Sequence, residues 1–226
     1  MFLTYTVIPS QGRPCLYDCL AALKAQTAHT FVISNGGFEH RALPGVSFVA
    51  ADTSELNISR WWNQGLDAVA AASDQAPHNV LLLNDDVILA PGSVARLNEA
   101  LRRTGATLAF ATAPHETAEQ VFREPGPPRI TGWCFMLRGE VGLRADETLR
   151  WWCGDNDLDW SARRLSGSVA VPGVERTHLF HNSYTKEHPD LVEQGARDYE
   201  LFVAKWGRSP SSRSLDEVLA GACNPS

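Results

Sequence analysis

The residues with the clearest chemical potential lie in Val80–Leu89, where an apolar run leads into Asn84, Asp85 and Asp86. An apolar run of this length is typical of a strand buried on both faces. Two adjacent carboxylates at its carboxyl end do not belong in a core, because burying unpaired charge is costly. Strand ends of this kind form the ligand site of open α/β sheets, and carboxylate oxygens suit a hard divalent cation that itself holds phosphate oxygens. The stretch therefore predicts a cation and phosphate site.

Strand and helix patterns alternate through the first half of the chain, as a site at a sheet edge requires. Short apolar runs predict strands, and apolar positions at the 3.6-residue period predict helices. Besides the central run, strands are expected at Leu3–Pro9, Thr30–Ser34, Val46–Ala51 and Thr107–Thr112, and helices after the loop Ser10–Pro14 and at Asn57–Ala72 and Pro91–Arg103. This alternation is typical of an α/β fold with a parallel, doubly wound sheet.

The alternation weakens after about Pro114, where a Pro-rich loop occupies Glu124–Arg129. The later elements are expected to be strands at Ile130–Arg138 and Ser168–Val174, a short helix at Gly154–Ser166, and a last helix marked by Leu191, Gly195, Tyr199, Phe202 and Trp206. We expect one domain over residues 1–208, with halves at 1–113 and 114–208, and a Ser-rich tail at 209–226.

Composition narrows the class of protein. The net charge of −6 gives no support for non-specific binding to nucleic acid, although a local basic groove stays open. Five cysteines without a dense framework favour a reduced, intracellular setting. The N-terminal stretch lacks a basic region, and no run approaches the ~18 apolar residues of a membrane helix. We therefore expect a soluble, cytoplasmic protein, with a peripheral membrane role left open.

Several motifs, taken in order, resemble family 2 of the glycosyltransferases, which are nucleotide-sugar-dependent enzymes of GT-A fold. The resemblance covers roughly residues 4–185. It implies a GT-A-like, Rossmann-type, mostly parallel sheet, with residues 1–113 binding the nucleotide and residues 114–208 on the acceptor side. The matching motifs are the opening strand and nucleotide loop VIPSQGRPCLYDCLAAL, the Asn-x-Gly helix ISRWWNQGL, the metal-binding strand LLLNDDVILAPGSVARL, the acceptor-side carboxylate motif WWCGDNDLDWSARRLSG and the late histidine strand VPGVERTHLFHNS.

The Asn84-Asp85-Asp86 triplet stands where this family has its DXD-type motif. A nucleoside diphosphate leaving group gains negative charge, and Mn²⁺ or Mg²⁺ bridging its phosphates stabilises that charge. The resemblance implies Asp86 as the direct metal ligand, with Asp85 contacting the metal, the ribose or the groups around the metal ligands, and Asn84 among the nucleotide-sugar contacts. The structural alternative is a strand end followed by an Asp-rich turn.

An acidic residue of the second motif acts in this family as general base toward the acceptor hydroxyl. Asp155 matches it best, because the pair Asp157-Leu158 follows as it does in the family; Asp157 is expected to be mainly structural or to contact the acceptor. Helix capping is the alternative, since Asp and Asn favour a helix start. The helix dipole would also lower the pKa of Asp155 and weaken it as a base unless the group is partly desolvated.

His178 lies six residues after Pro172, which is the family's Pro-to-His spacing, and so is implied as a contact to the metal or the diphosphate. His181 is the reserve candidate. A lone His at a strand end is otherwise a surface or hydrogen-bonded residue.

Loop and helix residues complete the expected donor site. Asn35 stands where the family has a base-pairing Asp, and its amide offers both a donor and an acceptor. The alternative for Asn63 is that Asn63-Gln64-Gly65 only eases close helix packing. The candidate nucleotide-sugar contacts are Pro9, Ser10, Arg13, Asn35, Arg60, Asn63, Asn84 and Asp85.

Paired tryptophans are the aromatic candidates. Trp faces are common sugar platforms, yet Trp is usually a core residue. Trp151 and Trp152, beside the expected base, are candidates for the acceptor site, whereas Trp61 and Trp62 are expected to pack in the core.

These expectations describe a metal-dependent enzyme that transfers a sugar from a nucleotide-diphosphate donor to an acceptor hydroxyl, with inversion by direct displacement. The acceptor classes left open are a glycan, a lipid-linked glycan, a natural product and a modified nucleic acid. One alternative is a sugar nucleotidyltransferase, although the loop SQGRP supplies only one Gly and one Arg of the Gly-rich, basic loop usual there. The other is a non-catalytic relative that binds a nucleotide sugar or a glycan.

Overall fold

The protein has an α/β fold whose main sheet has six of its eight strands running the same way. The computed structural model describes residues 2–74, 76–112, 116–128, 130, 132–179 and 188–210. In sheet order the strands are β3 (Val46–Ala50), β2 (His29–Ser34), β1 (Leu3–Ser10), β4 (His78–Leu83), β8 (Cys134–Arg138), β6 (Leu108–Ala111), β9 (Ser168–Val171) and β7 (Gln120–Phe122). Only β8 and β7 run against the others. The mostly parallel α/β sheet expected from the sequence is confirmed.

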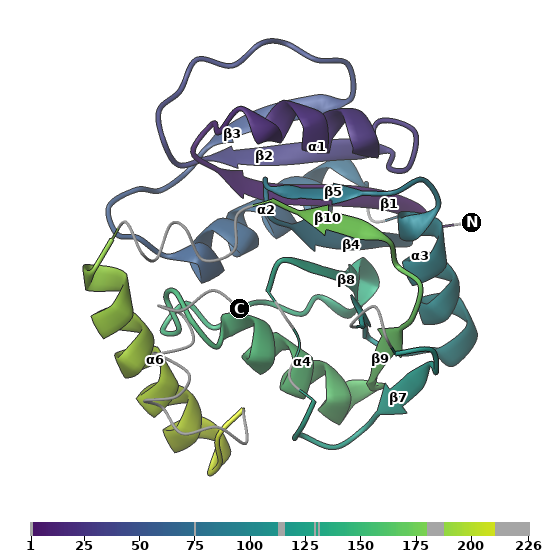
Figure 1. The fold of residues 1–226 in the computed structure, drawn as a ribbon, viewed down its shortest axis with the longest axis vertical. Coiled ribbons are helices and arrows are strands. Elements are labelled where there is room, and N and C mark those ends of the chain that lie inside the picture. Colours follow the sequence, from purple (N-terminus) through teal and green to yellow (C-terminus); the bar gives the residue numbers. More distant parts are fainter. Residues whose placement is uncertain are drawn as a thin grey trace.

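Helices cover both faces of this sheet (Figure 1). One face packs against α1 (Cys15–Leu23) and α3 (Ser93–Thr104), and the other against α2 (Ile58–Ala72) and α4 (Gly154–Leu165). Neighbouring residues of one strand enter opposite cores, as Leu81 and Leu82 do, because side chains alternate along a strand. The result is a three-layer arrangement that leaves the strand ends as the place for a site.

The apolar run at 80–89 is divided rather than continuous, which corrects the expectation of one strand. β4 ends at Leu83, the chain turns through Asn84–Asp86, and β5 (Val87–Leu89) leaves the main sheet to pair antiparallel with β10 (Arg176–His178). Val87 and Leu89 are still buried, in the same core as α1 and α3. The acidic turn therefore lies at the break between two sheets.

Other boundaries shift where loops begin. The strand expected from Ile130 begins only at Cys134, and the one expected to reach Val174 ends at Val171, before the Pro172-Gly173 turn. The short edge strand β7 is exposed and weakly apolar, so its pattern gave no strand signal. A 3-10 turn, η1, occupies Gly139–Val141.

The last helix, α6 (Asp190–Trp206), packs beside α4 at one side of the molecule (Figure 1). Its contact is aromatic: Trp160 of α4 meets Phe202 with ring centroids 4.8 Å apart and Trp206 at 5.4 Å. The tail from 211 and the reserve candidate His181 lie outside the described residues.

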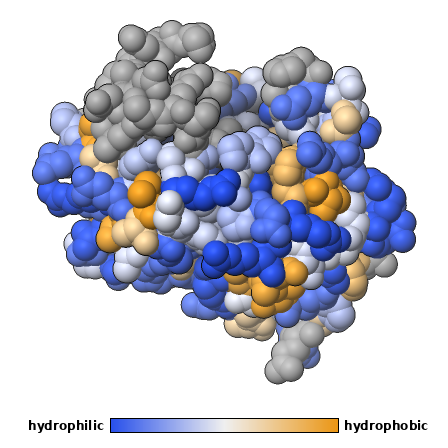
Figure 2. All heavy atoms as spheres, turned by 90° about the horizontal axis from the view of Figure 1, so that it is seen from below, coloured by the Kyte–Doolittle hydropathy of each residue, from blue (hydrophilic) through white to orange (hydrophobic). Residues whose placement is uncertain are grey.

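Neither the surface view (Figure 2) nor the described helices show a long apolar region. Figure 2 shows a face on which hydrophilic residues predominate and hydrophobic ones form small separate patches. Within the part of the chain that the structure describes, every helix is too short or too polar to cross a bilayer. Cys15, Cys19, Cys134 and Cys153 are buried.

Candidate functional site

The acidic turn meets the late histidine through backbone pairing. Residue 178 lies opposite Val87 in the β5–β10 ribbon, and Leu179 N donates to Asp86 O at 3.0 Å. This register places His178 Nε2 3.3 Å from Asp86 Oδ1, and Asp86 is only 4% exposed. Two candidates that lie 92 residues apart in the sequence are thus brought face to face.

The neighbouring carboxylate joins the acidic turn to the first loop. Ser10 Oγ donates to Asp85 Oδ2 at 2.6 Å and accepts from Gly12 N at 3.0 Å. Burial raises the pKa of Asp85, and the adjacent Asp86 charge raises it further, while Arg13 opposes the shift. The expected nucleotide loop, including the buried Pro9, therefore lies beside the acidic turn.

Gly12 is required where this loop turns. Its φ is +81°, a conformation that side chains rarely adopt, and a Cβ atom there would overlap the ring of Phe38. The loop is fixed by packing as well as by Ser10.

The donor set suits a divalent cation that completes its coordination from a ligand. Within the described residues Asp86 Oδ1 accepts no hydrogen bond and faces the His178 ring, whereas one oxygen of Asp85 is already bonded to Ser10. Among the same residues no three His, Cys, Asp or Glu side chains are grouped as a metal site. A cation would therefore draw on Asp86 and His178 and on phosphate or water oxygens, which is how Mg²⁺ is commonly held beside phosphates.

Asp155 lies in the first turn of α4 and is the accessible member of its acidic motif. Asp157 and Asp159 are 2% and 0% exposed, whereas Asp155 is half-buried. Its Oδ1 accepts from Asn156 Nδ2 at 2.7 Å. A Cβ atom built on Gly132 would stand 3.2 Å from Asp155 Oδ2, so the backbone of Gly132 lies against this carboxyl group.

The dipeptide Gly132-Trp133 joins the two acidic motifs. Trp133 O accepts from Asn84 N at 3.0 Å, and the Trp133 ring lies 5.6 Å from the His178 ring. The Arg176 guanidinium also lies over this ring, 4.4 Å from its centroid. Asp155 and the Asp86–His178 pair therefore lie on either side of one dipeptide at the sheet edge.

Sequence reasoning missed Gly132. The available signal was a Gly inside the strand expected at Ile130–Arg138, because Gly within a strand often marks the close approach of another group. Its significance depends on β8 running antiparallel to β4, with Cys134 opposite Leu83, so that the amino end of β8 lies at the carboxyl end of β4.

The other carboxylates of the motif serve the structure. Asp157 accepts from Trp206 Nε1 at 2.7 Å and pairs with Lys205 Nζ at 2.9 Å. These contacts with α6 agree with the structural role considered for Asp157, and its contact with an acceptor stays a prediction. Asp159 pairs with Arg163 at 2.7 Å, and burial raises the pKa of Asp159 to about 6 despite that partner.

Arg60 and Asn63 both make contacts within the protein, and their expected role toward the nucleotide stays a prediction. Arg60 forms ion pairs with Asp52 at 3.0 Å and Glu147 at 3.2 Å. Asn63 Nδ2 donates to Ala145 O at 3.0 Å, and Asn63 Oδ1 accepts from Ala145 N at 2.9 Å. The reason is local: the loop before α4 passes over this face of α2 and saturates both side chains.

The two tryptophan pairs differ in burial. Trp61 and Trp62 are 1% and 4% exposed, in agreement with the packing role. Trp151 meets the ring of Trp61 edge-on at 6.5 Å, and Trp152 lies against Gly195 of α6. Both are half-buried, and their contact with an acceptor stays a prediction.

Asn35 follows β2 next to the first loop. Its N–H donates to Ser10 O at 2.9 Å, while its buried Oδ1 accepts no hydrogen bond within the described residues. The base contact expected of Asn35 stays a prediction.

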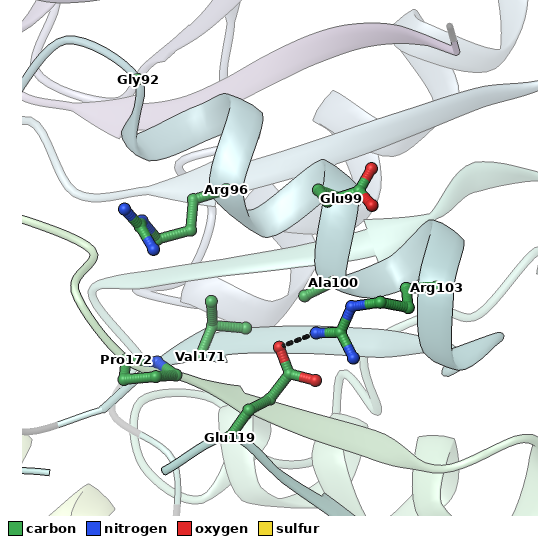
Figure 3. Close-up of a pocket in the computed structure, with 8 residues that line it drawn as sticks. All are labelled: Gly92, Arg96, Glu99, Ala100, Arg103, Glu119, Val171 and Pro172. Carbon is green, nitrogen blue, oxygen red and sulfur yellow. Dashed lines mark hydrogen bonds and ion pairs between the residues drawn. The ribbon is translucent and has the colours of Figure 1, made fainter. Parts of the chain in front are cut away.

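A separate pocket of about 370 Å³ lies along α3 and contains none of the expected site residues. Figure 3 shows Arg103 pointing to Glu119, with which it forms an ion pair, while Arg96 points away from that pair. Glu99, also on the rim, pairs with Arg102 at 2.6 Å. Most of the charge in this pocket is therefore balanced within the protein.

Comparison with known proteins places the fold. No family model and no curated protein matches the chain. The crystal structure of S. aureus TarS, residues 1–349, has a TM-score of 0.50 at 10% identity, over 96% of this chain and 68% of that one. A crystal structure of 4-diphosphocytidyl-2C-methyl-D-erythritol synthase has a TM-score of 0.45 at 14% identity, over 62% and 76% of the two chains. The likeness to TarS concerns the fold alone: the chain has a Rossmann-like, GT-A-like α/β fold.

Proposed function

We propose that this protein is a glycosyltransferase that moves a sugar from a nucleoside-diphosphate donor to an acceptor hydroxyl. The observation that carries the proposal is the arrangement of Asp86, His178 and Asp155 around Gly132-Trp133. Asp86 and His178 would hold the cation that stabilises the leaving group. Asp155, an accessible carboxylate near the same strand ends, would be the base.

The donor would lie at the carboxyl ends of β1 and β4, between the Ser10 loop and the acidic turn. Asp86 and His178 would hold Mn²⁺ or Mg²⁺, which when bound stabilises the charge on the diphosphate. Arg13, on the same loop, provides a further positive charge, and its effect on the pKa of Asp85 places it within electrostatic reach of the turn. Asn35 would offer its unpaired Oδ1 to the base edge.

Asp155 would act as general base in a single displacement. Its carboxylate takes the proton of the acceptor hydroxyl while that oxygen attacks the anomeric carbon. The bond from the anomeric carbon to the diphosphate oxygen breaks, its electron pair leaves with the diphosphate, and the configuration inverts. Asn156 donates to Oδ1 and so orients the group. Trp151 and Trp152 would contact the acceptor.

The first experiment measures donor binding by thermal shift. The protein is mixed with each nucleoside diphosphate, with and without Mn²⁺. A ligand that binds only the folded state raises the free energy of unfolding, by about 2.7 kcal/mol at a ligand concentration of 100 Kd, and so raises the melting temperature. We expect one diphosphate to stabilise the protein strongly only when Mn²⁺ is present, and Asp86→Asn to abolish that dependence. The surface variant Glu99→Gln is the control.

The second experiment identifies the reaction. Nucleotide sugars are incubated with the protein, and released nucleoside diphosphate and pyrophosphate are measured separately. Slow metal-dependent release of nucleoside diphosphate, lost in Asp155→Asn in the presence of an acceptor, supports the proposal. Pyrophosphate release from a nucleoside triphosphate and a sugar phosphate would instead identify a nucleotidyltransferase, and binding without any release would identify a non-catalytic binding protein.

A further inference from the structure

Helix α6 contacts the turn that precedes the candidate base, and it does so through one buried side chain, Asp198. This residue is 0% exposed, yet it lies far along the chain from the acidic motif. Its Oδ2 accepts from Trp151 N at 2.7 Å and Trp152 N at 2.8 Å, and its Oδ1 accepts from Arg150 N at 3.1 Å. Three successive backbone N–H groups thus converge on one carboxylate, in the arrangement by which a backbone concavity binds an anion.

The same turn is held from its other side by α2. Ile58 N donates to Arg150 O at 2.7 Å, and Ser59 Oγ donates to Leu149 O at 2.5 Å. Carbonyls of the turn therefore bond to the first turn of α2 while its N–H groups bond to Asp198. With both sets of groups engaged, the turn between the two helices has one position.

The residue that follows this turn is in an unusual conformation. Cys153 has φ of +63°, which is uncommon for a residue with a side chain, and it directly precedes α4. Such a conformation persists only where surrounding contacts over-determine it, and it is frequent at functional sites. Gly154 then packs against α2, because a Cβ atom there would stand 2.6 Å from Ser59 Oγ. Asp155 is the next residue, so its place is set by this sequence of contacts.

We propose that Asp198 is a positioning residue for Asp155, and that α6 thereby completes the acceptor side of the site. This inference rests on the proposed function, in which Asp155 is the base. Asp198 touches no reacting group; it fixes the backbone of Arg150–Trp152, which sets the start of α4. Gln194, one turn earlier on α6, donates to Asp198 Oδ1 at 2.8 Å and holds the carboxylate in place.

The test compares Asp198→Asn with Glu193→Gln, an acid-to-amide change at an exposed position of the same helix. The amide that Asp198→Asn introduces has one accepting oxygen in place of two, so at least one backbone N–H loses its partner. We expect kcat for sugar transfer to fall by about 10- to 100-fold, as small misplacements do, with KM for the donor changed less than twofold. Glu193→Gln should leave both values unchanged. A folded Asp198→Asn with kcat within twofold of wild type, or with kcat and donor affinity lost equally, would overturn the proposal.

A second readout does not depend on activity. Nuclear magnetic resonance follows hydrogen exchange at the Trp151 and Trp152 amides and the carboxyl resonance of Asp155. In Asp198→Asn we expect both amides to exchange at least tenfold faster and the Asp155 resonance to shift; unchanged signals would overturn the proposal. If the wild-type protein transfers no sugar, the proposed function fails while these signals still decide the role of Asp198. If Asp198→Asn does not fold, Gln194→Ala should show the same changes more weakly, and their absence there would contradict the proposal.

Discussion

The backbone of Gly132 lies directly against the carboxyl group of Asp155, with room for a hydrogen atom and little more. A Cβ atom at residue 132 would stand 3.2 Å from Oδ2 and 3.3 Å from Cγ of Asp155. Asp155 Cβ would also stand 3.3 Å away, so a Cβ atom at residue 132 would require the whole Asp155 side chain to shift slightly. The relationship makes Gly132 a sensitive point for function.

We therefore expect Gly132→Ala to lower kcat for sugar transfer by about 10-fold or more, through displacement of Asp155, with little change in melting temperature. A double-mutant cycle with Asp155→Asn checks the cause. If the methyl group acts through Asp155, it should have no further effect once the carboxylate is gone. Additive losses in the double variant would show that Gly132 acts by another route.

Ser10 links the first loop to the acidic turn, and its removal should weaken donor binding. Ser10→Ala leaves the Asp85 carboxylate and the Gly12 N–H without the partner that each has at 2.6 and 3.0 Å. Unmaking such buried bonds costs about 1–3 kcal/mol. We expect a lower melting temperature and a nucleoside-diphosphate affinity reduced by about 10-fold in calorimetry. The control is Ser47→Ala on the edge strand β3, which removes a hydroxyl bonded to His29 of β2. It should leave the affinity unchanged.

Local sequence pattern predicted much of the fold. Each helix buries a periodic apolar face, and the central strands bury continuous apolar runs. Leu81, Leu82 and Leu83 marked the central strand in this way. Pairing between distant segments was different: the contact of His178 with Asp86 depends on the register of β10 against β5, and no periodicity of either segment specifies that partner. The strand-end pattern indicated the carboxylates of the acidic turn, whereas the family resemblance indicated His178 and favoured Asp86 over Asp85.

Other contacts at the site have the same origin. Asn63 lies on a helix, as predicted, but its hydrogen bonds with Ala145 come from a loop 82 residues away in the sequence. Asp157 was correctly placed at a helix start, but only the docking of α6 decides that Trp206 and Lys205 occupy it. Such competition between a ligand and a distant segment is a tertiary effect that the sequence of either element alone does not contain.

A substitution at Asn63 tests whether its contacts with the loop or a contact with the nucleotide matters more. Asn63→Ala removes both hydrogen bonds to Ala145, so we expect a loss of stability of about 1–3 kcal/mol. Because the side chain is saturated by the loop, KM for the nucleotide sugar should stay within twofold of wild type. Denaturant unfolding and donor kinetics measure the two effects. A tenfold weaker donor affinity with unchanged stability would instead indicate that Asn63 contacts the nucleotide sugar.

The buried pair Asp159–Arg163 makes stability depend on pH in an unusual direction. Burial raises the pKa of Asp159 from 3.8 to about 6 in the folded protein. Between these values the folded state binds more protons at this carboxyl than the unfolded state does, so its contribution to stability is fully present below about pH 4 and is lost as pH rises through about 6. Asp159→Asn should remove this part of the pH dependence, as measured by unfolding in urea from pH 4 to pH 8.

Arg163 sets the upper end of that range, and its replacement should extend it. Arg163 lies 2.7 Å from Asp159 and donates to Gly126 O and Pro128 O in the Pro-rich loop. In Arg163→Met the carboxyl loses the neighbouring charge that lowers its pKa, so the folded state should keep its proton to higher pH. The variant should be less stable than wild type at every pH, by about 3–5 kcal/mol at pH 8, where a lone buried carboxylate is most costly, and by less at pH 5. An equal loss at both pH values would mean that Arg163 stabilises the protein through the loop carbonyls and not through Asp159.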